Sequence, residues 1–165
     1  MNLLIAIIMA VLLKVSLTVS STAFQNNGMI PSKFTCDGAN INPPLKIVGA
    51  PSNAKSLAII LDDPDAPNGT FVHWVIWNIK PTDMIAENSA PGVQGKNGTG
   101  KMGYFGPCPH TGTHHYYFKV YALDATLDLK EGADKKALET AMQNHIVGYG
   151  ELVGTYAKAT KMENK

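Results

Sequence analysis

Ionisable side chains gather in two short segments of the sequence, each beside a loop rich in Gly and Pro. The first segment contains Asp63, Asp65 and His73, and the second, Gly106–Tyr116, contains three of the five histidines. Histidines oriented by an aspartate suit a small anion such as a phosphate monoester. Loops at strand ends often present such side chains from a rigid support. We therefore predict one small-anion pocket where the two segments meet.

A structural role for the same side chains is the main alternative. Asp65 is placed to cap its own turn, and His73, beside Trp74, fits a hydrogen-bonded histidine of the core. Residue spacing alone leaves both interpretations open.

A metal centre also has to be considered, because four of the five histidines lie in these segments. His110, His114 and His115, with Asp63, offer ligands of the kind that zinc uses. His114 and His115 are adjacent, however, and neighbouring residues of a strand point to opposite faces of the sheet. We therefore predict no metal ion and no cofactor.

An enzyme is a weaker alternative than a binding protein. Asp63 and His73 offer an acid/base pair for a hydrolase or lyase. The sequence contains no Gly-x-Ser-x-Gly nucleophile motif, however. We predict no catalytic residues and expect binding without turnover.

Four apolar runs, rich in β-branched and aromatic residues, predict the strands that position these side chains. They span 56–62, 71–79, 115–123 and 152–157. Pro64 and Pro67, followed by Asn68–Gly69, favour a loop between the first two runs. This loop joins Asp63 to the strand that carries His73.

One helix is predicted late in the chain, over 134–147, with Gly148 as its stop. The residues that share one face of it are Leu138, Ala141, Met142 and His145. Several strands and a single late helix predict a mainly β fold, a sandwich with one or two peripheral helices near the C-terminus.

The region 82–101 is rich in Gly, Asn and Pro and is predicted to be a long connecting loop. Such loops in a compact domain are usually functional or mobile. The region supports a third interpretation, an inhibitor or interaction module that acts on an unknown protein partner through this loop.

The N-terminus carries a predicted signal peptide, residues 1–23. Leu3–Leu13 has no charged residue, but it is shorter than the roughly 20 apolar residues that cross a bilayer. Small residues at Ser21 and Ala23 favour cleavage before Phe24. The mature chain, 24–165, is then a single periplasmic or secreted domain with no membrane span. The alternatives are an uncleaved anchor and a cytoplasmic protein.

The two cysteines, Cys36 and Cys108, are an even number, as expected in an oxidising compartment. They form either one disulfide or two buried free thiols. The predicted export favours the disulfide.

The charge composition makes nucleic acid an improbable partner. The formal net charge is only +1, and all 14 basic residues are Lys. The chain therefore lacks Arg, the usual bidentate reader of guanine and phosphate. We predict no nucleic-acid function.

Eight short sequence motifs, which follow one another in a fixed order, are spread over nearly all of the predicted mature chain. They are Ala23–Pro31, Phe34–Gly38, Asn42–Pro44, Asp63–Pro67, His73–Ile79, Gly103–Pro109, His114–Tyr116 and Ala122–Asp124. In this order they resemble the phosphatidylethanolamine-binding protein family, in the bacterial branch commonly labelled Raf-kinase-inhibitor-like. An ordered set is far more specific than Asp-Pro-Asp-Ala-Pro alone.

The resemblance implies a sandwich of two antiparallel sheets and no established catalysis. It also implies a pocket for phosphate-like or acetate-like anions and phospholipid head groups. Carried over residue by residue, the implied ligand-binding residues are Asp63, His73, Pro109, His114 and Tyr116, with Gly106 shaping the loop.

Two positions depart from the family pattern. His110 stands where a second Pro is usual, and His115 replaces the Arg of His-Arg-Tyr. Loss of a permanently charged guanidinium makes anion affinity depend more on histidine protonation. We expect sulfate to bind more tightly as the pH falls from about 7.5 toward 5.5, because His73 and His114 gain charge there.

Overall fold

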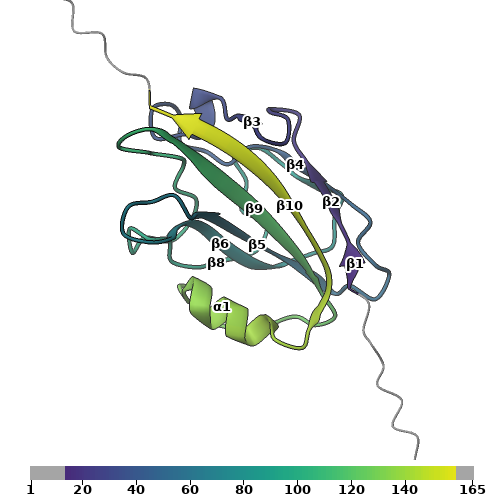
Figure 1. Cartoon of the computed structure of the whole chain (residues 1–165). Coiled ribbons are helices and arrows are strands. Elements are labelled where there is room, and N and C mark those ends of the chain that lie inside the picture. Colours follow the sequence, from purple (N-terminus) through teal and green to yellow (C-terminus); the bar gives the residue numbers. More distant parts are fainter. Residues whose placement is uncertain (1–13, 159–165) are drawn as a thin grey trace, which may run out of the picture.

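Two β-sheets packed on each other form the body of the protein (Figure 1). The computed structural model describes residues 14–158. The strands are β1 (Val15–Ser16), β2 (Thr18–Ser20), β3 (Gly28–Met29), β4 (Leu45–Val48), β5 (Ser56–Asp63), β6 (Phe71–Ile79), β7 (Met84–Ile85), β8 (Val93–Gln94), β9 (Thr113–Leu123) and β10 (Ile146–Ala157). A 3-10 turn, η1 (Ser32–Phe34), and one α-helix, α1 (Lys135–Met142), complete the described elements.

The larger sheet has seven strands in the order β1-β10-β9-β5-β6-β8, with β3 also paired to β10, and the smaller sheet has the order β2-β4-β7. Most neighbouring strands are antiparallel, whereas β1 and β3 run parallel to β10. The predicted mainly β sandwich is confirmed.

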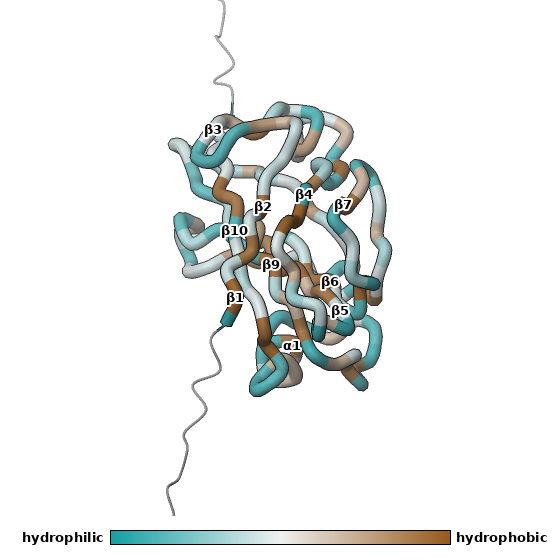
Figure 2. The backbone as a smooth tube through the Cα atoms, turned by 90° about the vertical axis from the view of Figure 1, so that its right-hand side faces the viewer, coloured by the Kyte–Doolittle hydropathy of each residue, from teal (hydrophilic) through white to brown (hydrophobic). Residues whose placement is uncertain are grey.

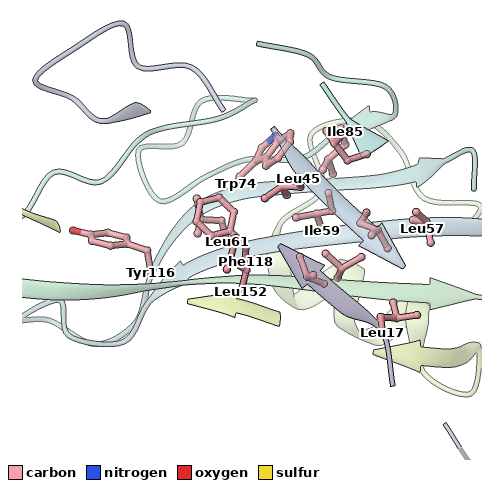
Figure 3. Close-up of a cluster of buried hydrophobic side chains, with 14 of the residues drawn as sticks. Leu17, Leu45, Leu57, Ile59, Leu61, Trp74, Ile85, Tyr116, Phe118 and Leu152 are labelled. Atoms are coloured by element: carbon pink, nitrogen blue, oxygen red, sulfur yellow. The ribbon is translucent and has the colours of Figure 1, made fainter. Parts of the chain in front are cut away.

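The main core lies between the two sheets. On β4, buried Leu45 and Ile47 alternate with exposed Lys46 and Val48, which makes the inner face of the smaller sheet apolar. Apolar positions lie mainly on the strands and polar ones on the connections (Figure 2). Side chains from both sheets meet in this core, among them Leu17, Leu45, Ile59, Leu61, Trp74, Ile85, Phe118 and Leu152 (Figure 3).

The central strands follow the predictions closely. β6 has the predicted bounds, β5 extends one residue further to Asp63, and β9 begins two residues earlier than predicted. All eight residues of β5 are buried, because β5 lies between β6 and β9 and apolar clusters cover both of its faces.

The helix is shorter than predicted. α1 places Leu138 and Met142 against the outer face of the larger sheet and ends there. Asn144 adopts a positive φ of 68°, a conformation that helices do not continue through. The β-branched pair Ile146–Val147 then joins β10, so Gly148 lies inside a strand and does not stop the helix. Within residues 14–158, no helix is long and apolar enough to span a membrane.

The region 82–101 is mostly the connecting segment that the sequence predicts, but it is interrupted by two short strands. It contains β7 and β8, and Asn42 fastens the segment between them. The Asn42 amide donates to the carbonyl of Ala86 at 2.9 Å, and its oxygen accepts from the backbone N–H of Ser89 at 2.9 Å. The region is therefore part of the folded body, which weakens the interpretation of a mobile docking loop.

The segment just before the predicted cleavage point takes part in both sheets. β1 pairs with Gly148 and Tyr149 of β10, and β2 pairs with β4. Leu17 and Val19 are only 4% and 7% exposed. Cleavage before Phe24 stays a prediction, but it would remove both strands, whereas cleavage before Val15 would keep them. The apolar run 3–13 lies outside the described residues.

We expect a chain that starts at Phe24 to be less stable than one that starts at Lys14. Loss of the burial of Leu17 and Val19 should lower the free energy of unfolding by about 3 kcal/mol or more. Urea unfolding of the two chains measures the difference, with the longer chain as the control. Equal midpoints with equal slopes would show that β1 and β2 contribute nothing to stability.

Candidate functional site

A cavity of about 460 Å³ opens at one end of the larger sheet. It lies between the turn after β5, the loop 105–110 and the start of β9. The predicted residues Asp63, His73, Pro109 and His114 line it. The structure thus brings the two ionisable segments together, as predicted.

A second hollow, about 470 Å³ and more open, lies beside α1. It carries the mixed charges of Lys96, Asp134, Lys135, Lys136 and Glu139. Four of these side chains are exposed, and Lys135 is already paired with buried Asp62. The first cavity is the better candidate site, because buried ionisable groups meet there.

Asp63 is the fixed charge at the base of the cavity. Its side chain is 4% exposed, and both of its oxygens are occupied. Oδ1 accepts from the backbone N–H of Asp65 at 2.8 Å, and Oδ2 accepts from Nδ1 of His114 at 2.7 Å. This bond places the proton of a neutral His114 on Nδ1 and leaves Nε2 free for another partner.

A β-bulge in β6 positions His73. Leu61 of β5 pairs with Trp74, and the next residue of β5 pairs with Val72, so His73 is the extra residue. Val72 and Trp74 consequently pack on opposite faces of the sheet although they are two positions apart. Bulges near functional sites redirect side chains in this way.

The His73 ring is held from three sides. Nδ1 donates to the carbonyl of Phe105 at 2.7 Å, the Phe105 ring stacks on the imidazole, and Phe71 and Tyr116 approach it edge-on. Burial lowers the pKa of His73, and it outweighs the opposing effects of the Phe105 hydrogen bond and the Asp63 charge. His73 therefore stays neutral over a wider pH range than an ordinary histidine, so the sequence-based expectation that it gains charge as the pH falls toward 5.5 is weakened.

A disulfide between Cys36 and Cys108 anchors the loop 105–110, with the two Cα atoms 5.4 Å apart. The predicted bond is confirmed and the alternative of two free thiols is wrong. Gly106 fastens the same loop, because its N–H donates to Oδ1 of Asn40 at 2.7 Å. A Cβ at Gly106 would lie 2.5 Å from the carbonyl oxygen of Phe34, so only glycine fits at this close approach.

Two of the predicted ligand-binding residues, Gly106 and Tyr116, lie behind the cavity lining. Tyr116 is fully buried, and its hydroxyl has no hydrogen-bond partner among the described residues. The hydroxyl points away from the other labelled core side chains (Figure 3). Burial raises the pKa of Tyr116, and the charge of Asp63 raises it further. Tyr116 thus supports the rings of His73 and His114 from behind.

The two aspartates pair differently from the predictions of the two alternatives, a capping Asp65 and an Asp63–His73 acid/base pair. Asp63, rather than Asp65, accepts the turn N–H, and Asp65 instead accepts from both the N–H and Nδ1 of His115 at 2.8 and 2.7 Å. These hydrogen bonds lower the pKa of Asp65. Asp63 bonds to His114 and not to His73, so the acid/base pair considered for a hydrolase is not formed.

His114 and His115 point to opposite faces, as predicted. His114 turns inward to Asp63, whereas the side chain of His115 is 48% exposed and pairs with Asp65. Among residues 14–158, no three His, Cys, Asp or Glu side chains are grouped so that they could hold a metal ion.

Aromatic residues in the wall were not among the predicted site residues. Phe71 and Phe105 line the cavity with ring centroids 6.0 Å apart. Phe71 is the first residue of the predicted strand that carries His73, and Phe105 directly precedes Gly106. Both could have been identified from the sequence as neighbours of predicted site residues.

The fold defines a β-sandwich protein with a cavity at one end of its larger sheet. Residues 20–157 match the model of the phosphatidylethanolamine-binding protein family. The chain belongs to this family, which confirms the resemblance seen in the sequence. The branch within the family stays a prediction.

Similar proteins occur in species of Pyrococcus, Chlamydia and Mycobacterium. A UPF0098 protein of Pyrococcus horikoshii is 55% identical over 156 residues, which are 88% of this chain and 78% of the relative. A crystal structure of a phosphatidylethanolamine-binding protein homologue from Chlamydia trachomatis is 41% identical, with a TM-score of 0.84, covering 87% of this chain and 99% of the other. LppC of Mycobacterium tuberculosis, named as a lipoprotein, is 41% identical over 145 residues, which are 85% of this chain and 72% of the relative.

Replacement of both Cys36 and Cys108 by Ala should loosen the cavity loop and destabilise the fold. We expect the free energy of unfolding to fall by about 2 to 4 kcal/mol, because the bond closes a long loop of the unfolded chain. Denaturant unfolding of oxidised, reduced and double-variant protein measures this. A reduced protein as stable as the oxidised one would show that the disulfide has no energetic role.

The buried His73 should make stability depend on pH. The unfolded chain takes up a proton near pH 6.5 while the folded protein resists it, so stability should decline as the pH falls below about 6.5. His73→Gln should flatten this decline, and His145→Gln, at a partly exposed position outside the cavity lining, serves as the matched control. Urea unfolding at several pH values tests the prediction, and an unchanged pH profile in His73→Gln would contradict it.

Proposed function

We propose that this protein binds a small phosphate-bearing ligand, a phosphate monoester or a phospholipid head group, without turning it over. The observation that carries the proposal is the fixed Asp63–His114 pair facing a cavity that the buried His73 also lines. Such a cavity, mostly apolar with a few convergent polar groups, is typical of small-ligand sites. The cavity volume of about 460 Å³ suits a ligand of head-group size.

The charge of the lining shapes how an anion would be held. The described lining contains one carboxylate, three histidines and no Lys. An anion would therefore depend on Nε2 of His114 and on His110 at the exposed rim, with each bond strengthened when the imidazole is protonated. Since Asp63 accepts from Nδ1 of His114, it orients the ring and adds a negative charge to the cavity.

An extracytoplasmic location is part of the proposal. The Cys36–Cys108 disulfide suits an oxidising compartment. The relative named as a lipoprotein supports the same location. The alternative of a cytoplasmic protein requires this disulfide to persist in a reducing environment.

A hydrolase is the second candidate, because the Asp63–His114 pair resembles an oriented general base. Against it, the described lining offers no Ser, and Cys108 is held in the disulfide. Binding without turnover is therefore preferred.

Calorimetric titration with acetate, inorganic phosphate, methyl phosphate and glycerophosphoethanolamine tests the function. At least one phosphate-bearing ligand should bind the wild type, and His114→Ala should weaken it about tenfold or more, since a hydrogen bond to a charged group is lost. His145→Ala, far from the cavity, is the matched control. If none of these ligands binds, the proposed function is wrong, and release of methanol from methyl phosphate would favour the hydrolase.

A further inference from the structure

His73 offers the cavity a hydrogen-bond acceptor and not a donor. Its Nδ1 proton is committed to the carbonyl of Phe105, which has no proton to give in return. In a neutral ring the other nitrogen, Nε2, must then carry a lone pair. The backbone of Gly106 also interacts with the ring and favours its protonated form, as a carbonyl acceptor does, so neither Phe105 nor Gly106 donates to Nε2.

The free nitrogen is reached from the cavity. His73 is 2% exposed and lines the cavity. The side-chain polar atoms that are sealed off without a partner among the described residues are Trp77 Nε1 and the Tyr116 hydroxyl. The small accessible part of His73 thus includes Nε2. A bound ligand that excludes water from Nε2 without donating a hydrogen bond to it would leave this nitrogen unpaired, which costs binding free energy.

Building on the proposed function, we propose that the pocket selects a phosphate monoester in its singly protonated form, whose P–OH donates to His73 Nε2. His73 is then a specificity-determining residue, because it requires a hydroxyl on phosphorus. A phosphodiester has no such hydroxyl, sulfate carries no proton at these pH values, and the doubly ionised monoester has lost its proton.

The surrounding charges favour the same ionic form. Asp63 of β5 repels a second negative charge, while His114 of β9 and His110 of the loop can bind the remaining oxygens when their imidazoles are protonated. Asp62, buried on the opposite face of β5, is neutralised by Lys119 and Lys135. No Lys lines the described cavity to stabilise a dianion.

The lowered pKa of His73 favours the same ionic form of the ligand. A phosphate monoester loses its second proton near pH 6, and burial lowers the pKa of His73. As the pH falls below about 6 the ligand gains this proton, while the lowered pKa delays the loss of the His73 lone pair. Both partners needed for the P–OH···Nε2 bond are then present together.

Titration with three matched probes tests the inference. Methyl phosphate, dimethyl phosphate and sulfate are compared at about pH 5.5 and 7.5. We expect methyl phosphate to bind at least about tenfold more tightly than the other two at the lower pH, since one buried acceptor is satisfied only by this probe. Its affinity should fall at the higher pH, while that of dimethyl phosphate changes in step with histidine charge alone.

The result separates this inference from the proposed function. Equal affinity for the three probes would overturn the inference and leave phosphate binding intact. No binding of any probe, together with no binding of glycerophosphoethanolamine, would overturn both.

His73→Gln supplies the second test, because a glutamine amide can donate as well as accept. The preference for methyl phosphate over sulfate should fall to about twofold or less. His145→Gln should keep the full preference, and urea unfolding confirms that both variants fold. An undiminished preference in folded His73→Gln would show that His73 is not the selecting group.

Vesicles distinguish a lipid from a soluble source of the monoester. Phosphatidylcholine vesicles that contain phosphatidic acid present a phosphate monoester, and those that contain phosphatidylethanolamine present a diester with an ammonium group. Binding to the phosphatidic acid vesicles would support a lipid monoester. Binding to methyl phosphate but to neither kind of vesicle would support a soluble monoester. Preference for phosphatidylethanolamine vesicles would overturn the inference, since the ammonium would then be the donor.

Discussion

The buried carboxylate of Asp63 is the interaction on which the site depends. A charge this far from solvent is tolerable only when its oxygens are bonded, and here one accepts from the turn at Asp65 and the other from His114. The same two bonds fix the turn after β5 and attach β9 to it. One side chain therefore shapes the wall of the cavity and sets the proton position of a neighbouring histidine.

Strand alternation then distributes the adjacent ionisable residues into separate roles. On β5, Asp62 faces outward to Lys119 and Lys135, and Asp63 faces the cavity. On β9, the inward His114 and the outward His115 separate in the same way. The bulge in β6 adds an inward position that alternation would not provide, and His73 occupies it. Regular alternation along β5 and β9 and this bulge in β6 together produce the set of groups around the cavity.

Much of this arrangement could be predicted from sequence, and the exceptions have physical causes. The apolar runs of β5, β6 and β9 are long enough to identify, and the ordered motifs placed Asp63, His73 and His114 in one pocket. Short strands such as β2 and β7 have two or three residues and gain their stability from partners distant in sequence.

Local pattern also could not place the end of α1, where the left-handed Asn144 and pairing with β9 override a helical spacing. The proton positions of His73 and His114 depend on a carbonyl 32 residues away and a carboxylate 51 residues away along the chain. Only the folded structure shows these partners.

The way the N-terminal segments meet β10 also affects how copies of the protein behave toward one another. β1 covers one end of the outer edge of β10 and β3 covers the other, and the N–H groups of Leu17, Asn27 and Ile30 bond to its carbonyls. An uncovered twelve-residue strand would present a row of free backbone donors and acceptors, which is a template for pairing with another chain. β1 and β3 thus protect this edge from pairing with another chain, and a protein without β1 would expose part of it to self-association.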